Sequence, residues 1–227
     1  MDRMKQAMAK RVKLKLKLRG GVAKSDVSAK PAAVPAAVPR GAKLLLASAS
    51  PRRAELLRNA RIAYAVIPTQ AAEVRRHQEW PEDFVRRLAG EKAAVVLAKH
   101  PDKFVLGADT VVIVEGEVLG KPKDAQDASR MLHLLSGGSH LVTTGVCLRG
   151  PGVDDTRAET TRVSFSPLSD ADIAEYVASG EPMDKAGAYG IQGVASRWIT
   201  HLDGCYFNVM GLPVPLVFRM LREHGVL

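Results

Sequence analysis

Two adjacent arginines stand where a helix is expected to begin. Residues 46–53 read LASASPRR, and the residues that follow predict a short helix over 51–60 with Ser50 as its N-cap. Cations are unfavourable in a first helical turn, because that end of the helix already carries a partial positive charge. An anion would reverse the balance by binding the free N–H groups, the Ser50 hydroxyl and the guanidinium groups of Arg52 and Arg53. The segment therefore predicts a site for a polyphosphate, with two solvated surface arginines as the alternative.

A carboxylate forms the second candidate. Asp109 lies in the apolar run FVLGADTVVIV, directly after the small residues Gly107 and Ala108. Aspartate is depleted in strand interiors, so its presence here calls for an explanation. A carboxylate at the end of a buried strand can hold Mg²⁺ or orient a water molecule. The alternative is an aspartate at a strand end that makes only local hydrogen bonds.

A lysine on an apolar helix face is the third candidate. Phe84, Leu88, Lys92 and Val96 follow one another at intervals of four in a long helix expected over residues 81–100. A lysine in that position can extend its charged end to water, which is the usual explanation. It can also direct its ammonium group at a bound phosphate. The neighbouring phosphate site makes Lys92 a candidate ligand for the same anion.

Three further stretches carry weaker signals. Glu73 lies in an expected loop and Lys121 follows a strand, and a surface role is the default for both. The stretch DKAGAYGIQG (184–193) combines Asp184, an aromatic residue and Gln192 with several glycines. Glycines allow a backbone to approach a ligand closely, and a side-chain amide can read the edge of a base. By itself this stretch points to no specific ligand.

The elements that must position these residues alternate between helices and hairpins. Hydrophobic periodicity predicts strands over 44–48, 63–68, 140–150 and 156–168, two strands within 103–122 and a hairpin over 196–214, together with helices over 51–60, 81–100, 124–138, 169–181 and 215–225. The last-but-one helix has Ser169 as its cap and Asp172 three residues later. This mixture predicts a mixed α/β sheet and not a regular series of βαβ units.

The charge is divided unevenly along the chain. The 227 residues carry a net charge of +9, but residues 1–43 hold 12 Lys or Arg against two Asp, and the remainder is close to neutral. We therefore expect a basic, Pro/Ala-rich disordered tail over 1–42 and one folded domain over 43–227. The tail could be dispensable or a misassigned start, an electrostatic arm for acidic surfaces or nucleic acid, or an organellar transit peptide. The folded domain itself shows no charge signal for nucleic acid.

Several classes of protein are excluded or disfavoured by what the sequence lacks. No apolar run approaches the 18 or so residues of a membrane span. The motifs GxxxxGK(S/T), HExxH and GxSxG are absent, which argues against a P-loop, a zincin and a serine-hydrolase elbow. Cys147 and Cys205 form no CxxC pair, as expected of a reduced intracellular protein. The histidines are scattered, and His140 is expected to be structural.

Taken together, these segments resemble the Maf family of nucleoside triphosphate pyrophosphatases. The resemblance spans roughly residues 43–225 and rests on LASASPRRAELL, RLAGEKA, VLGADTVV, GKPKDAQDASRML, LSGGSH with TTGV, DKAGAYGIQG and NVMGLPV, in that order. Seven ordered matches are far more specific than any one of them. The tail lies outside the resemblance.

The resemblance implies both a fold and an activity. The fold would be a curved mixed sheet flanked by helices with a central nucleotide cleft, similar to inosine-triphosphate pyrophosphatases. The activity would be hydrolysis of a nucleoside triphosphate to the monophosphate and pyrophosphate, assisted by Mg²⁺ or else Mn²⁺. Carried over by motif, the implied catalytic residues are Asp109, Glu73 and Lys92, the metal ligands are Asp109 and Glu73, and the substrate-binding residues are Ser50, Arg52, Arg53, Thr110, Lys121 and Gln192.

Finer properties follow from the same resemblance. DKAGAYGIQG is similar to the subclass acting on dTTP and UTP, so pyrimidine triphosphates, modified ones included, are the expected substrates. A 7-methyl-GTP pyrophosphatase and a non-hydrolytic nucleotide sensor acting on cell division are the alternatives. The family often has Asp-Glu where this chain has Ala72 and Glu73, which weakens the metal role of Glu73. A cytoplasmic location and a homodimer are further expectations, although no residue pattern marks an interface.

Overall fold

The computed structural model describes residues 43–69 and 73–227, so the tail expected over 1–42 lies outside the described residues. The elements in chain order are β1 (Leu44–Ala47), α2 (Pro51–Asn59), β2 (Ala65–Val66), α3 (Pro81–Leu97), β3 (Phe104–Val114), β4 (Glu117–Leu119), α4 (Ala125–Leu135), β5 (Ser139–Gly150), β6 (Val153–Phe165), α5 (Asp170–Ala178), three short 3-10 helices (Glu181–Asp184, Ala186–Ala188 and Val194–Arg197), β7 (Ile199–Asp203), α6 (Tyr206–Val209) and α7 (Val214–Glu223). None of the described helices is both long and apolar enough to cross a membrane.

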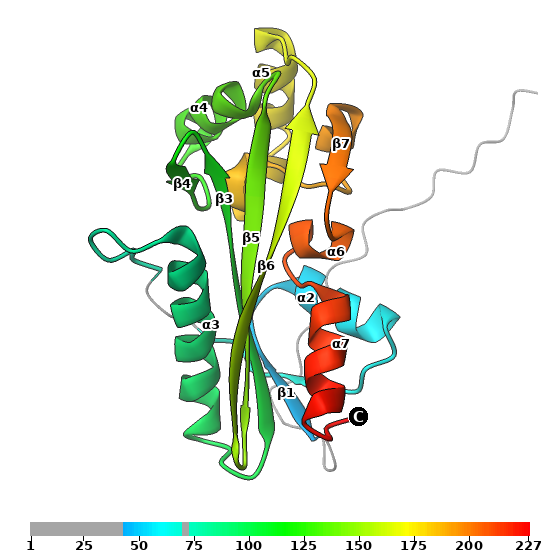
Figure 1. The fold of residues 1–227 in the computed structure, drawn as a ribbon. Coiled ribbons are helices and arrows are strands. Elements are labelled where there is room, and N and C mark those ends of the chain that lie inside the picture. The colour runs from blue at the N-terminus through cyan, green and yellow to red at the C-terminus, as the bar shows by residue number, and fades with distance from the viewer. Residues whose placement is uncertain (1–42, 70–72) are drawn as a thin grey trace, which may run out of the picture. The chain divides into compact units, whose positions relative to one another are not determined.

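One mixed sheet organises these elements. The strand order is β2-β1-β3-β5-β6-β7, and β4 pairs with β3 outside this path. β1 is parallel to β2 and β3, while the pairs β3–β5, β5–β6 and β6–β7 are antiparallel. Figure 1 shows the long strands β3, β5 and β6 with α3 on one side and α2 and α7 on the other. The predicted mixed α/β fold, a sheet flanked by helices, is confirmed.

Helix α3 lies unusually close to the sheet because two glycines face it. A Cβ atom on Gly107 of β3 would lie 2.1 Å from the carbonyl oxygen of Ala89 in α3. A Cβ on Gly145 of β5 would lie 2.4 Å from the carbonyl of Val85 in the same helix. Only glycine permits such approaches between helix and strand backbones. The helix therefore lies directly over β3. The short distance between the two backbones determines how close to the strand the side chains that α3 directs at it can lie.

The opposite face and one end of the sheet carry the rest of the core. Leu57 of α2 and Val217 of α7 are fully buried against the face that includes Leu106. The amphipathic helices α4 and α5 cover the end of the long strands, where Leu132 and Ile173 are buried. Each helix buries one apolar stripe, as its periodicity predicts.

Local capping signals were informative, but one predicted element is wrong. Ser169 and Asp172 form the expected capping box at the start of α5. The hairpin predicted over 196–214 does not form: Ile199–Asp203 is a single strand, and the residues after it turn into the short helix α6. The strand instead pairs with β6, whose residues precede it by about 40 positions in the sequence.

Candidate active site

A pocket of about 1100 Å³ lies between the start of α2, strand β3 and the loop that contains the 3-10 helices. Its volume is sufficient for a nucleotide-sized ligand. One part of its wall is charged and another part is apolar. The charged and polar lining residues include Ser50, Arg52, Arg53, Glu73, Arg75, Lys92, Asp109, Thr110, Lys121, Asp184, Lys185 and Gln192, and the apolar ones include Phe84, Val111, Val112, Val118, Val142, Ile191, Val209 and Met210.

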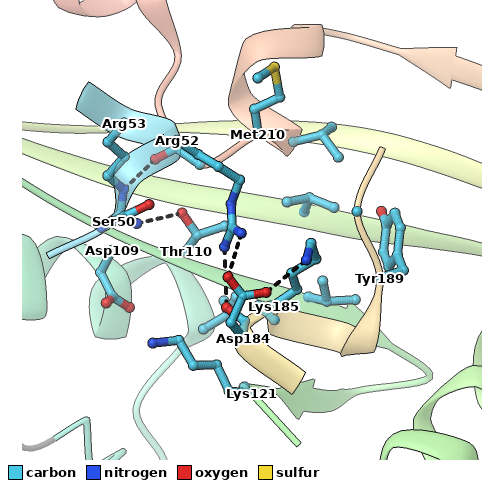
Figure 2. Close-up of a pocket in the computed structure, with 18 of the residues that line it drawn as sticks. Ser50, Arg52, Arg53, Asp109, Thr110, Lys121, Asp184, Lys185, Tyr189 and Met210 are labelled. Carbon is cyan, nitrogen blue, oxygen red and sulfur yellow. Dashed lines mark hydrogen bonds and ion pairs between the residues drawn. The ribbon is translucent and has the colours of Figure 1, made fainter. Parts of the chain in front are cut away.

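The start of α2 points into this pocket. Ser50 occupies the N-cap with extended backbone, but its side chain does not cap the helix, and the first turn contains no acidic residue. Arg52 reaches across the pocket to the loop 184–193 and donates from Nη1 to the Asp184 carboxylate at 2.7 Å (Figure 2). Asp184 also accepts a hydrogen bond from Lys185 Nζ at 2.7 Å. One exposed carboxylate therefore holds two pocket cations in place.

Arg53 is bound quite differently from its neighbour. Its Nε donates to the carbonyl of Gly211 at 2.7 Å, and its Nη1 donates to the carbonyl of Ala108 at 2.9 Å. Nη1 also donates to Ser48 Oγ at 3.3 Å, and Nη2 donates to Thr110 Oγ1 at 3.0 Å. The two arginines that look equivalent in the sequence thus have different surroundings, because Arg53 is held by protein acceptors on several sides.

Asp109, Lys92 and Glu73 converge on one point. Asp109 lies on the face of β3 that α3 covers, since Gly107 and Val111 at alternate positions also contact that helix. Lys92 Nζ of α3 donates to the Asp109 carboxylate at 2.5 Å and to the Glu73 carboxylate at 2.8 Å. Asp109 and Lys92 are almost fully buried, and Glu73 is about half exposed.

The two carboxylates of this cluster differ in acidity. Burial raises the pKa of Asp109, although the charges of Lys92 and Arg53 oppose the rise. Burial acts on Glu73 in the same direction, but the hydrogen bond and charge of Lys92, together with Lys121, outweigh it and lower the pKa of Glu73. A pair of carboxylates with separated pKa values suits different roles, one as a proton acceptor and one as a permanent charge.

The donor set is compatible with a hard divalent cation. No group of three or more His, Cys, Asp and Glu side chains that could hold a metal ion occurs among the described residues. Mg²⁺, however, is usually held by one or two carboxylates and completes its coordination with water and substrate phosphate oxygens. Asp109 and Glu73 supply two carboxylates beside the same ammonium group, so the residues fit a cation that arrives with a triphosphate.

The remaining residues expected from the sequence also line the pocket. Lys121 lies just after β4, and its charge acts on Glu73. Thr110 follows Asp109 on β3 and accepts the hydrogen bond from Arg53. Gln192 is an exposed residue of the loop 184–193. All the side chains expected at the site thus lie around one pocket, although they come from six separate segments of the chain.

His140 has a structural environment. It is buried in β5, and its Nε2 lies 2.8 Å from the hydroxyl of Tyr189, a pocket-lining residue. The rings of Phe165 and Tyr189 pack edge-on against it. Burial lowers the pKa of His140 to about 4, so the ring is neutral near pH 7. Its contact orients Tyr189, in agreement with the structural role expected for it.

Comparison with known proteins identifies the family. Residues 43–224 match the family model described as Maf-like protein. The chain belongs to the Maf family. Among curated members, a dTTP/UTP pyrophosphatase of Koribacter versatilis (strain Ellin345) is 56% identical over 187 residues, which cover 82% of this chain and 97% of that protein. A dTTP/UTP pyrophosphatase of Geobacter metallireducens (strain ATCC 53774 / DSM 7210 / GS-15) is 45% identical over 192 residues, covering 84% of this chain and 100% of that protein.

A solved structure also matches this Maf chain, with less similarity. The Staphylococcus aureus Ham1 protein superimposes with a TM-score of 0.45 and 12% identity, over 80% of this chain and 98% of that one. That level of likeness carries no conclusion about the site.

Sequence reasoning alone missed two features of this Maf pocket. It did not foresee that Asp184 pairs with Arg52, because 132 residues separate them in the chain. It also treated Arg53 as a second phosphate ligand equivalent to Arg52, whereas most of its donors contact the protein. The one available signal for the Asp184 pairing was the charged pair that opens DKAGAYGIQG, and it did not identify a partner.

Proposed function

We propose that the protein hydrolyses dTTP and UTP, modified pyrimidine triphosphates included, to the nucleoside monophosphate and pyrophosphate. The observation that carries the proposal is the cluster of Asp109, Lys92 and Glu73 in the same pocket as the cations at the start of α2. The substrates are suggested by relatives named dTTP/UTP pyrophosphatase, the first of which is 56% identical. A nucleoside triphosphate needs a cationic site for its phosphates and an apolar site for its base, and this pocket has both.

The two ends of the pocket take the two ends of the substrate. Arg52, Lys121 and Lys185 present cationic groups to the β- and γ-phosphates, and the Ser50 hydroxyl and the backbone N–H groups in the first turn of α2 add further donors. The apolar wall that includes Val112, Val142 and Met210 receives the base. Gln192 lies on the glycine-containing loop beside it, where its amide can hydrogen-bond to a base edge.

The chemical step is an attack by water on the α-phosphorus. The bond between that phosphorus and the oxygen bridging to the β-phosphate breaks, and pyrophosphate leaves with the bonding electrons. Asp109 accepts the proton of the attacking water, a role suited to a buried carboxylate whose pKa is raised. Lys92 holds Asp109 in place, and its positive charge favours the ionised form of the carboxyl group. Positioning and charge stabilisation contribute most of the rate in such transfers.

A divalent cation, Mg²⁺ or Mn²⁺, belongs to the same proposal. Asp109 and Glu73 would hold it, and when bound it would neutralise charge on the phosphates. Glu73 suits this role because its lowered pKa keeps it ionised over the working pH range. We also propose a cytoplasmic location, where free nucleotides are available as substrates. A homodimer is a separate part of the proposal.

The experiment that tests this function is a substrate panel. The purified protein is incubated with Mg²⁺ and dTTP, UTP, 5-methyl-UTP, CTP, GTP, 7-methyl-GTP or ITP, and pyrophosphate is measured separately from phosphate. Pyrophosphate from dTTP and UTP is the expected result. A preference for 7-methyl-GTP would keep the reaction and overturn the substrate class, and binding without turnover would support a nucleotide sensor.

A further inference from the structure

Arg53 has almost no hydrogen-bonding capacity left for a ligand. A guanidinium group has five N–H donors, and four of those of Arg53 are used by Gly211, Ala108, Ser48 and Thr110. Breaking these bonds to bind a phosphate would leave carbonyl and hydroxyl acceptors without a donor, which is unfavourable for buried groups. Arg52, by contrast, donates hydrogen bonds only to Asp184 among the described residues, and its side chain is 30% exposed.

The acceptors of Arg53 flank the catalytic carboxylate. Ala108 and Thr110 are the residues immediately before and after Asp109 on β3, and Arg53 holds both of them from the face of the sheet opposite α3. Asp109 itself points the other way, towards Lys92. Because a strand alternates its side chains, fixing both neighbours from one face fixes the direction of the residue between them on the other.

A second set of hydrogen bonds continues from Arg53 into the core. Thr110 Oγ1 accepts from Arg53, so its own proton can be donated to Thr144 Oγ1, which lies 2.9 Å away on β5. Thr144 in turn donates to the carbonyl of Asn208 in α6 at 3.2 Å. The Asn208 amide then donates to Thr161 of β6 at 3.0 Å. Thr144, Thr161 and Asn208 are all fully buried.

Both routes from Arg53 end at the same wall of the pocket. The direct route reaches Gly211, and the route through Thr110 and Thr144 reaches Asn208. The residues between these two points, Val209 and Met210, line the pocket. Gly211 has a φ of +103°, so its carbonyl is presented to Arg53 by a backbone conformation that other residues rarely adopt. Strand β3 and the segment 208–211 are thereby joined through one guanidinium group.

We propose that Arg53 is a positioning residue that fixes Asp109 relative to the pocket wall 208–211, and that Arg53 does not bind the triphosphate. This inference rests on the proposed function for its catalytic consequence. It separates the roles of the two adjacent arginines: Arg52 binds substrate phosphate, while Arg53 orients the strand that carries the reactive carboxylate.

The first test compares Arg53→Lys with Arg52→Lys. A lysine at position 53 keeps the charge but cannot bond in four directions, so Asp109 is displaced and kcat falls about 100-fold, while KM stays within about threefold. Arg52→Lys is expected to raise KM, with a smaller effect on kcat. The dissociation constant of a dTTP analogue with a methylene group between the α- and β-phosphorus should follow KM in both variants. A raised KM and weaker analogue binding in Arg53→Lys, with kcat retained, would overturn the proposal.

The second test changes the buried hydrogen-bond route without touching the pocket. Thr144→Val keeps the side-chain volume but removes the hydroxyl between Thr110 and Asn208. Its matched control is Thr143→Val, which removes the hydrogen bond of a buried threonine to Thr160 at 3.0 Å on the other face of β5. We expect kcat to fall about tenfold at unchanged KM in Thr144→Val, and to stay at the wild-type value in Thr143→Val. Equal kcat values in the two variants would contradict the route through Thr144.

A third measurement separates this inference from the proposed function. Hydrogen exchange of the backbone amides in the segment 208–212 needs neither substrate nor turnover. The exchange should accelerate in Arg53→Lys and Thr144→Val and remain slow in Thr143→Val, because only the first two lose a bond to that segment. Faster exchange in a protein that releases no pyrophosphate would keep the positioning role and overturn the function. Unchanged exchange in Arg53→Lys would overturn the positioning role.

Discussion

Asp109 is the single residue on which the proposed chemistry depends most. Its carboxylate is nearly buried, is paired with Lys92 at 2.5 Å and lies where a cationic pocket can place a phosphate. Lys92 keeps a second partner in Glu73 at 2.8 Å. After loss of the Asp109 charge, the buried ammonium group of Lys92 therefore still has one carboxylate partner. The fold keeps most of its contacts.

We predict that Asp109→Asn lowers kcat for UTP by about 1000-fold while the protein stays folded. The amide cannot accept a proton from water at neutral pH, although it has nearly the same shape as the carboxyl group. Steady-state kinetics and a thermal melt measure the two effects. Asp170→Asn is the matched control, because it removes an exposed carboxylate of α5 that pairs with His133 of α4, away from the pocket. Wild-type turnover in Asp109→Asn would exclude Asp109 as the catalytic carboxylate.

At the scale of elements, the seating of α3 on the sheet sets the distance between Lys92 and Asp109. Gly107 lies two residues before Asp109 on the same face of β3, and no side chain fits between it and Ala89. Lys92 follows Ala89 by less than one helical turn, so any shift of the helix at that point moves the ammonium group directly.

The variant Gly107→Ala is expected to lose both stability and activity. The added methyl group would lie 2.1 Å from a backbone oxygen that cannot rotate away, so α3 must move, at a cost of about 1–3 kcal/mol or more. Urea unfolding and kcat measure the two losses. Gly138→Ala is the control, because its Cβ would meet only ordinary contacts near 3.9 Å. Similar unfolding midpoints for the two variants would show that the close approach of α3 to β3 does not exclude a side chain at position 107.

For the molecule as a whole, the buried His140 links stability to pH. Burial lowers the pKa of His140 to about 4, whereas a histidine in an unfolded chain titrates near about 6.5. Between these pH values the unfolded chain binds a proton that the folded protein does not. The free energy of unfolding contributed by this group is therefore complete above pH 6.5 and is lost progressively as the pH falls towards 4.

We predict that this loss amounts to roughly 3 kcal/mol between pH 6.5 and 4 in the wild-type protein. His140→Gln should be less stable than the wild type at pH 7, where it loses the packing against Phe165 and Tyr189. Its stability should fall less steeply on acidification, because no imidazole remains to be protonated. Urea denaturation at a series of pH values measures both slopes. Parallel curves for the two proteins would exclude His140 as a source of the pH dependence.

How much could be predicted from the sequence depended on the separation between interacting residues. The start of α2 and the cap of α5 were predictable because Pro51 and Ser169 act on residues within one turn. The pairing of β7 with β6 and the contact of Arg52 with Asp184 join residues tens to more than a hundred positions apart, and no local pattern encodes them. The motif resemblance did gather the pocket residues, but it could not distinguish a phosphate ligand from a residue bound by its own protein.

The most direct test of the proposed reaction is a single turnover of UTP in water enriched with ¹⁸O. Attack on the α-phosphorus incorporates the label into the nucleoside monophosphate and leaves pyrophosphate unlabelled. We predict one ¹⁸O atom in UMP and none in pyrophosphate, measured by mass spectrometry. Label in pyrophosphate would place the attack on the β-phosphorus, and release of labelled inorganic phosphate with UDP would contradict the pyrophosphatase reaction altogether.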